Sequence, residues 1–170
     1  MDFADGHGPN VTPYEMFEKG IFGGTYWRPI YSSIIGQHLR DQHLEFPFEE
    51  HNIADNLLSE TVPDPKLNYF GVLAGSSLQE WESKGWIVPQ DPYGWVQWYC
   101  RYYEGRRSPD DERQIKRWFN YAGPKGRWRR NIINKMRTLR ESGGDWHQAS
   151  PVIQQGLLQW GYIVNEDDLS

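Results

Sequence analysis

The sequence has little cysteine and no long hydrophobic run. Cys100 is the only cysteine among 170 residues, which excludes an internal disulfide framework and is typical of a reducing compartment. No window approaches the roughly 20 apolar residues of a membrane-spanning helix. The chain starts with an acidic stretch, Met1 to Asp5, and lacks the apolar core of a signal peptide. We therefore expect an intracellular protein, in the cytoplasm or nucleus, with no membrane partner.

The motifs of several common enzyme classes are also missing. There is no glycine-rich phosphate loop of the Walker type, no GxGxxG, no GxSxG and no CxxC. His38 and His43 are five residues apart, whereas the two metal ligands of an HExxH helix are four apart. These absences argue against the common kinds of nucleotide hydrolysis, dinucleotide redox chemistry, serine hydrolysis and zinc proteolysis. We expect no metal and no cofactor.

Aromatic residues, in contrast, are abundant. The chain has 9 Trp, 10 Tyr and 7 Phe, and disordered chains lack such large rings. A chain of this length can bury a core without disulfides or a structural metal. We therefore expect one compact domain that spans residues 1–170.

The formal net charge of −5 hides a separation of charge along the chain. The segment from Trp98 to Arg140 has thirteen Lys and Arg against four Asp and Glu, a net +9, so the rest of the chain carries −14. Such asymmetry is typical of a surface for nucleic acid or another polyanion. The alternative is that the acidic and basic parts of one domain neutralise each other, and the sequence leaves both open.

Cap, proline and glycine signals divide the chain into helices. They predict helices at about 13–19, 78–84, 92–104, 109–121, 127–140 and 151–160. Residues 30–44 and 51–58 are weaker helical candidates, and no alternation is long enough to predict a sheet. The fold class is therefore mainly α, a single compact domain of about six short helices with long irregular connections. We expect the acidic tail, 163–170, to be flexible and to fray.

The region 91–141 combines positive charge with aromatic residues. Its tryptophans at helical spacing, Trp95, Trp98, Trp118 and Trp128, are predicted to lie in the core. The helices 109–121 and 127–140 are joined by a short Gly/Pro turn, which predicts a basic unit that resembles a helix-turn-helix. The residues that could contact an anion or nucleic acid are Arg106, Arg107, Arg113, Arg117, Lys125, Arg127, Arg130, Asn134 and Arg137. Arg106 and Arg107 are the leading candidates, because they lie between two helices at an expected exposed junction.

Candidates for catalysis are fewer. His51 and Asp55 are four residues apart and could form a base and its orienting carboxylate if that stretch is helical. His43 is a further weak candidate. Cys100 lies in an aromatic helix, where a buried, inert thiol is the favoured interpretation, although the neighbouring Arg101 leaves a reactive thiol open.

The block from Gly85 to Trp118 resembles one that a group of uncharacterised proteins shares. It consists of Gly85-Trp86-Ile87, Asp91-Pro92-Tyr93-Gly94-Trp95, Gln97 to Tyr103, Gly105-Arg106-Arg107 and Asp111 to Trp118. The resemblance covers a fifth of the chain and implies no activity. A second similarity, to Myb-like modules, lies in Gly126-Arg127-Trp128-Arg129-Arg130, but the regular spacing of three tryptophans is missing.

Three hypotheses about function follow. The first is a helical binding module whose basic, aromatic-rich surface engages nucleic acid or another phosphorylated anion. The second is a small enzyme, or a protein that binds a phosphorylated or other anionic small molecule, with an arginine-lined aromatic pocket and a His/carboxylate site. The third is a partner-binding protein with exposed rings. A concave pocket that gathers arginines would favour the second, and a convex basic face would favour the first. The sequence does not specify the oligomeric state.

Overall fold

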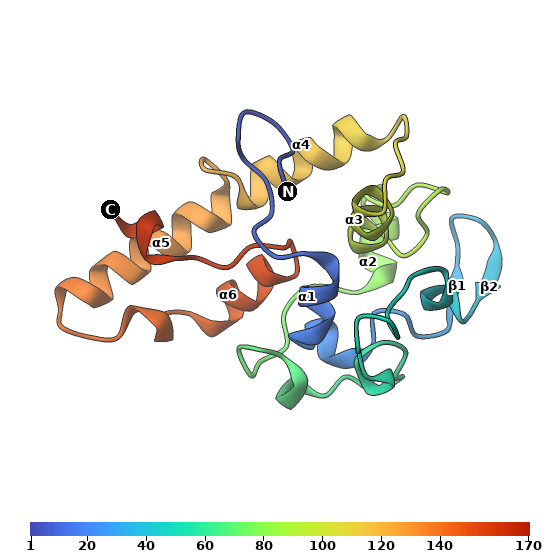
Figure 1. The fold of residues 1–170 in the computed structure, drawn as a ribbon, viewed down its shortest axis with the longest axis horizontal. Coiled ribbons are helices and arrows are strands. Elements are labelled where there is room, and N and C mark those ends of the chain that lie inside the picture. The colour runs from blue at the N-terminus through green and yellow to red at the C-terminus, as the bar shows by residue number, and fades with distance from the viewer.

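The computed structural model describes all residues, 1–170, and confirms a mainly α fold (Figure 1). Its α-helices are α1 (Pro13–Glu18), α2 (Leu78–Ser83), α3 (Trp95–Tyr103), α4 (Asp111–Ala122), α5 (Arg127–Glu141) and α6 (Pro151–Leu158). Two short strands, β1 (Ile30–Ser32) and β2 (Gln37–Leu39), form an antiparallel pair. None of the helices combines the length and the apolar character needed to cross a bilayer.

Two of the predicted helix starts follow from their caps. Thr12 forms the predicted capping box with Glu15 at the start of α1, and Pro13 occupies the first turn. The hydroxyl of Ser77 accepts a hydrogen bond from the amide of Glu80 at the start of α2. Local sequence therefore suffices to position these two short helices.

The third helix starts later than its sequence predicts. Asp91-Pro92 has the pattern of a cap followed by a first-turn proline, but α3 begins at Trp95 with Gly94 as its N-cap. The carboxylate of Asp91 cannot cap the helix, because it is engaged by Arg101 and Arg106. Gly94 has a φ of 94° and a ψ of −154°, a conformation that glycine adopts far more easily than other residues.

The weaker helical candidate 30–44 is not an α-helix: residues 30–39 form a hairpin, and Gln42–Glu45 form a 3₁₀ turn. Ile30 pairs with Leu39 and Tyr31 with His38 across β1 and β2. Gly36 has a φ of 66° and supplies the turn that would interrupt a helix. The stretch 51–58 is also not an α-helix, since only Asp55–Leu57 form a single 3₁₀ turn.

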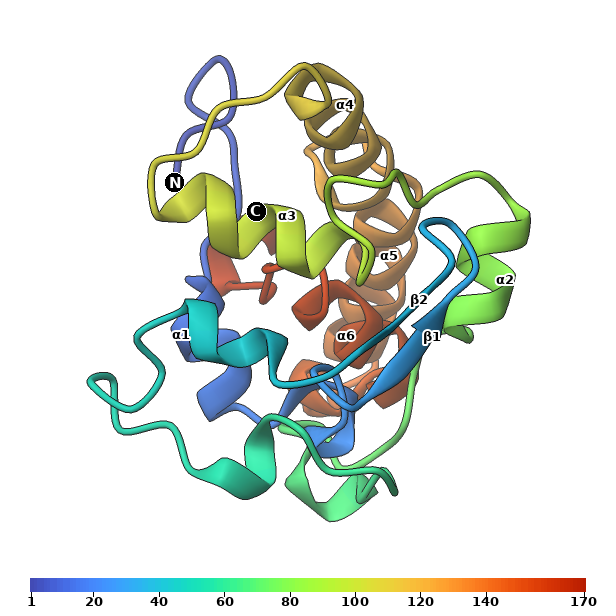
Figure 2. The same cartoon turned by 90° about the vertical axis from the view of Figure 1, so that its right-hand side faces the viewer.

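The two basic helices are present with the short turn that was predicted between them. Figures 1 and 2 show α4 and α5 following one another along one long side of the molecule. Glycine is required in the turn, because a Cβ on Gly126 would lie 2.6 Å from the main chain of Tyr121. α6 packs against α5, and the hairpin lies at the opposite end of the long axis from the end of α5 (Figure 1).

Large aromatic side chains form the centre of the core. Trp98 and Trp118 are fully buried and Trp95 is 6% exposed, as predicted, while Trp128 is half-buried. The indole N–H of Trp98 donates to Asp111 at 2.8 Å, and that of Trp118 donates to the carbonyl of Trp160 at 2.9 Å. The core therefore ties α3, α4 and the end of α6 together.

The acidic tail packs onto the protein. Leu169 is buried. Asp168 forms an ion pair with Arg129 of α5 at 2.9 Å and accepts a hydrogen bond from the Tyr162 hydroxyl. The flexibility of residues 163–170 stays a prediction, which the charge of the last residues suggested without the basic helix beside them.

Candidate functional site

Several arginines of the basic segment are neutralised inside the fold. Four of them form ion pairs: Arg101 with Glu45 and Asp91, Arg106 with Asp91, Arg113 with Asp110, and Arg129 with Asp168. Part of the charge asymmetry of the sequence is therefore neutralised in the fold by ion pairs between acidic and basic residues of one domain.

The junction of Arg106 and Arg107 shows how this happens. The guanidinium of Arg106 binds both carboxylate oxygens of Asp91 at 2.7 Å, and the Asp91 side chain is completely buried. Arg107 is exposed, stacks over the ring of Tyr102 at 3.7 Å and donates to the Tyr102 carbonyl. Arg106, a leading anion candidate, is therefore already occupied by an anion of the protein.

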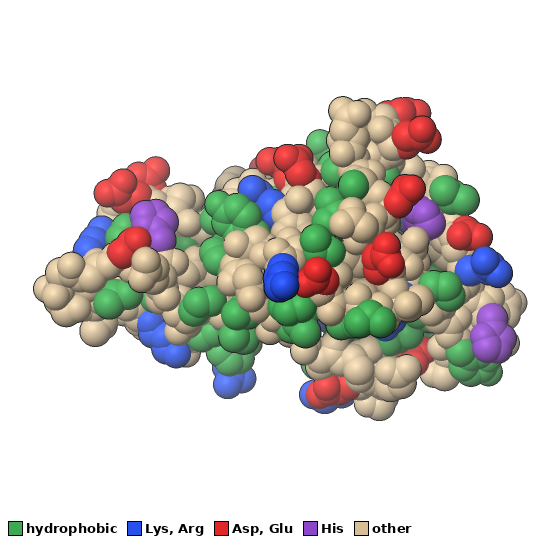
Figure 3. Space-filling view, turned by 90° about the horizontal axis from the view of Figure 1, so that it is seen from below, with side chains coloured by type: hydrophobic (Ala, Val, Ile, Leu, Met, Phe, Trp, Pro, Cys, Tyr) green, Lys and Arg blue, Asp and Glu red, His purple; other side chains and the backbone are tan.

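Part of the positive charge that forms no ion pair lies near the start of α5. Lys125, Arg127, Arg130 and Asn134 are exposed and none of the three cations forms an ion pair, whereas Arg137 donates to main-chain carbonyls of the last three residues. On the face seen from below, blue and red side chains are interspersed and no large blue area forms (Figure 3).

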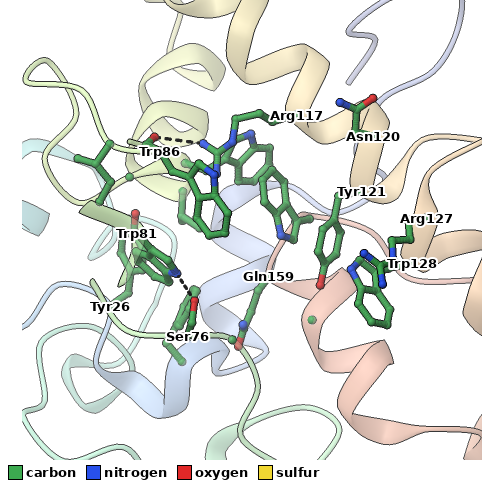
Figure 4. Close-up of a pocket in the computed structure, with 18 residues that line it drawn as sticks. Tyr26, Ser76, Trp81, Trp86, Arg117, Asn120, Tyr121, Arg127, Trp128 and Gln159 are labelled. Carbon is green, nitrogen blue, oxygen red and sulfur yellow. Dashed lines mark hydrogen bonds between the residues drawn. The ribbon is translucent and has the colours of Figure 1, made fainter. Parts of the chain in front are cut away.

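A cavity of about 410 Å³ opens between α3, α4, the start of α5, the end of α6 and the loops on either side of α2 (Figure 4). That volume is within the range of small-molecule sites, roughly 300–1,000 Å³. We call this cavity the aromatic pocket. Eight of its 18 lining residues are aromatic: Phe22, Tyr26, Trp81, Trp86, Trp95, Tyr121, Trp128 and Trp160. They include five of the nine tryptophans of the chain.

Arg117 of α4 is the charged group on the inner side of the aromatic pocket. Its guanidinium carbon lies 5.6 Å from the centre of the Trp86 ring and 5.3 Å from that of Trp160, so it is in cation–π contact with both indoles. It donates to the side chain of Gln114 at 2.8 Å and to the carbonyl of Trp86 at 3.3 Å (Figure 4). Unlike Arg101, Arg106 and Arg113, it forms no ion pair.

Burial and neighbouring charges set the electrostatic state of Arg117. Burial first, and then the positive charge of Arg113, lower the pKa of the Arg117 guanidinium to about 10, against the opposing effect of the Asp110 carboxylate. The group is therefore still protonated at neutral pH. A half-buried cation that forms no ion pair is costly in a folded protein.

The aromatic rings around Arg117 are packed against one another. Trp160 lies 4.8 Å from Trp95 and is stacked on Tyr121 at 5.0 Å between ring centroids. Tyr121 packs over Gly156, where an added Cβ would lie 2.8 Å from the tyrosine hydroxyl. Figure 4 shows Tyr121 between Arg117 and Trp128. The pocket thus offers flat apolar surfaces beside a cation.

The candidate catalytic residues lie outside the aromatic pocket. His51 is exposed and stacks on Tyr14, with ring centroids 3.8 Å apart. Asp55 begins the 3₁₀ turn, is exposed, and forms no hydrogen bond with His51. His43 is half-buried, and its Nδ1 has no hydrogen-bond partner. The structure does not bring these three residues together with the arginines of the pocket.

Cys100 is fully enclosed by the core. Burial, followed by the nearby carboxylates of Glu45 and Glu104, raises the pKa of its thiol well above the ordinary value. The favoured interpretation of an inert thiol therefore agrees with its position.

The sequence named Arg117 and Arg127 as candidates but did not indicate which aromatic residues surround them. Trp81, Trp86 and Trp160 come from segments far from α4 in the sequence, and no local spacing connects them. Comparison with family models, with curated proteins and with solved structures finds no match for this chain.

Proposed function

We propose that this protein binds a small, flat, anionic molecule in the aromatic pocket. The observation that carries the proposal is Arg117, a protonated and half-buried arginine that forms no ion pair. A negatively charged ligand would compensate that charge. The indole rings of Trp86 and Trp160 on either side favour a ligand with an aromatic ring, since such rings gain from stacked packing.

We favour binding over catalysis at this site. The lining residues include no Asp, Glu, His or Cys, so the pocket itself offers neither a general base that works near neutral pH nor a thiol nucleophile. The guanidinium of Arg117 is instead suited to binding an anion.

The test uses anilinonaphthalene sulfonate, a fluorescent aromatic anion, with the full chain. We expect saturable binding of one molecule per chain, and about tenfold weaker binding in Arg117→Met, the loss expected for a charge-assisted hydrogen bond. Arg130→Met is the matched control, because Arg130 is an exposed cation that does not line the pocket, and it should bind like the wild type. Equal affinity in Arg117→Met and the wild type would refute the proposal.

A second candidate function is binding of nucleic acid at the start of α5. It is favoured by one observation, the exposed and unpaired charges of Lys125, Arg127 and Arg130. It predicts that affinity for a single-stranded oligonucleotide, measured by fluorescence anisotropy, falls steeply with salt. It also predicts that replacing Lys125 and Arg130 by Gln weakens binding at every salt concentration. Absent or salt-independent binding excludes this candidate.

A further inference from the structure

The guanidinium of Arg117 uses only one of its nitrogens to bind the protein. Its Nη1 donates to the side-chain oxygen of Gln114 at 2.8 Å and to the carbonyl of Trp86 at 3.3 Å. A guanidinium has five N–H donors, so the hydrogen on Nε and the two on Nη2 remain. These donate to no group of the protein, and neither nitrogen is completely buried. Because Arg117 lines the aromatic pocket, this free edge is available to a ligand there.

The same edge binds a carboxylate in two other arginines of this protein. Nε and Nη2 of Arg113 donate to the two carboxylate oxygens of Asp110, at 2.6 and 2.9 Å. Nε and Nη2 of Arg101 donate to the two carboxylate oxygens of Glu45, at 2.8 and 2.6 Å. Two parallel bonds of this kind are typical of a guanidinium with an anion that presents two oxygens. In Arg117 the equivalent edge is empty, and Asp110 is already bound by Arg113.

From this comparison we infer that the ligand of the aromatic pocket is an aromatic oxyanion with two terminal oxygens, and that the Nε–Nη2 edge of Arg117 binds both of them; the inference rests on the proposed function. Carboxylates, sulfonates and phosphates share this feature. An anion with a single oxygen, such as a phenolate, cannot form the two parallel bonds. A lysine at this position would keep the positive charge but would lack the planar fork of donors.

Gln114 is the positioning residue for this edge. It precedes Arg117 by one turn of α4, is 1% exposed, and its side-chain oxygen accepts from Nη1. A guanidinium is planar and rigid, so a partner that fixes Nη1 also fixes the direction of Nε and Nη2. The rings of Trp86 and Trp160 are in cation–π contact with the same group. The edge is therefore held in place before a ligand binds, which lowers the entropy cost of binding.

The test compares pentafluorobenzoate, pentafluorobenzenesulfonate and pentafluorophenolate by isothermal titration calorimetry with the full chain at a slightly alkaline pH. The three probes share one ring and one negative charge, but the phenolate has a single oxygen. The sulfonate represents the tetrahedral oxyanions and the benzoate the planar ones. Both are expected to bind about tenfold more tightly than the phenolate in the wild type.

Two variants test the residues behind this preference. Arg117→Lys keeps the charge and should reduce the preference for the two-oxygen probes to about twofold or less. Gln114→Met removes the oxygen that accepts from Nη1. It should weaken both two-oxygen probes by about threefold and leave the phenolate unchanged, a change of ratio that a merely structural role would not produce.

Each other outcome overturns a defined part of the account. If the phenolate binds as tightly as the two-oxygen probes, or if Arg117→Lys keeps their full advantage, Arg117 supplies charge alone and the inference is wrong. The proposed function then still stands if Arg117→Met weakens the sulfonate dye. If Gln114→Met changes all three affinities equally, or none, Gln114 is not a positioning residue. If no probe and no dye binds, the proposed function itself fails. The comparison of probes in the wild type remains decisive even if a variant folds poorly.

Discussion

Arginine side chains in this protein lie in two different surroundings, one with a buried carboxylate and one between aromatic rings. Arg101 and Arg106 converge on the buried carboxylate of Asp91, at 2.9 and 2.7 Å. Arg117, on the next helix, is in cation–π contact with Trp86 and Trp160 and forms no ion pair. The nearby carboxylate of Asp110 is itself bound by Arg113. The charge of the first group is neutralised within the fold by Asp91 and Glu45, although the Nε of Arg106 has no hydrogen-bond partner. We therefore interpret the first group as structural and Arg117 as a binding group.

The net charge of a sequence segment also differs from the charge that the folded protein exposes on its surface. The net +9 of residues 98–140 suggested one continuous polyanion site. In the fold, acidic residues from distant parts of the chain reach into this segment, as Glu45 does with Arg101 and Asp168 with Arg129. The distribution that remains is uneven, with one half-buried arginine that forms no ion pair, Arg117, and exposed cations that include Lys125 before α5 and Arg127 and Arg130 on it.

The largest effect is expected when the structural group is broken. Asp91→Asn leaves Arg101 and Arg106 without their buried counterion and should lower the free energy of unfolding by about 3–5 kcal/mol. Asp110→Asn removes a more exposed ion pair and should cost about 1 kcal/mol or less. Urea denaturation of both variants and the wild type measures the difference. Equal losses would mean that the Asp91 group has no special structural role.

A smaller effect is expected at the start of α4. Burial of Asp111 acts to raise its pKa, but hydrogen bonds from Ser108 and Trp98 outweigh burial and lower it below the ordinary value. A carboxylate with a lowered pKa stabilises the fold above its unfolded pKa of about 3.9 and loses this contribution as the pH falls through the folded value.

Asp111→Asn should therefore lower the unfolding free energy by about 2 kcal/mol at neutral pH. The gap to the wild type should close as the pH falls below about 4. Urea denaturation across this pH range measures both quantities. A gap that stays constant with pH would show that the charge of Asp111 is unimportant.

The smallest effect on stability is expected in the binding group. Arg117→Met loses hydrogen bonds to Gln114 and Trp86 but also removes a half-buried charge that forms no ion pair. These effects oppose each other, so the unfolding free energy of the unliganded protein should change by no more than about 1 kcal/mol. A loss as large as that of Asp91→Asn, measured in the same urea series, would place Arg117 with the structural arginines and would contradict the comparison.

Local features of the fold could be predicted from the sequence. Caps at Thr12 and Ser77, the turn that contains Gly126, and the apolar spacing of Trp98 and Trp118 led to correct helices and a correct core. Each of these depends on residues within a few positions of one another. The sequence therefore defined the helices better than it defined how they meet.

Features that depend on distant residues could not be predicted. α3 begins later than its sequence predicts because Asp91 binds arginines that lie ten and fifteen residues later in the chain. The hairpin at 30–39 depends on a turn at Gly36, whose positive φ is not visible in a helical pattern. The aromatic pocket gathers segments from Phe22 to Trp160, and only folding brings them together.

The most direct test of the central claim uses the nine tryptophans as reporters. Their indole N–H resonances can be followed in one two-dimensional NMR titration of the full chain with anilinonaphthalene sulfonate. Binding in the aromatic pocket predicts shifts at its own tryptophans, Trp81, Trp86, Trp95, Trp128 and Trp160. The remaining four, Trp27, Trp98, Trp118 and Trp146, should stay largely unchanged. Shifts centred on Trp146, or no shift at any indole, would contradict the assignment of this pocket as the binding site.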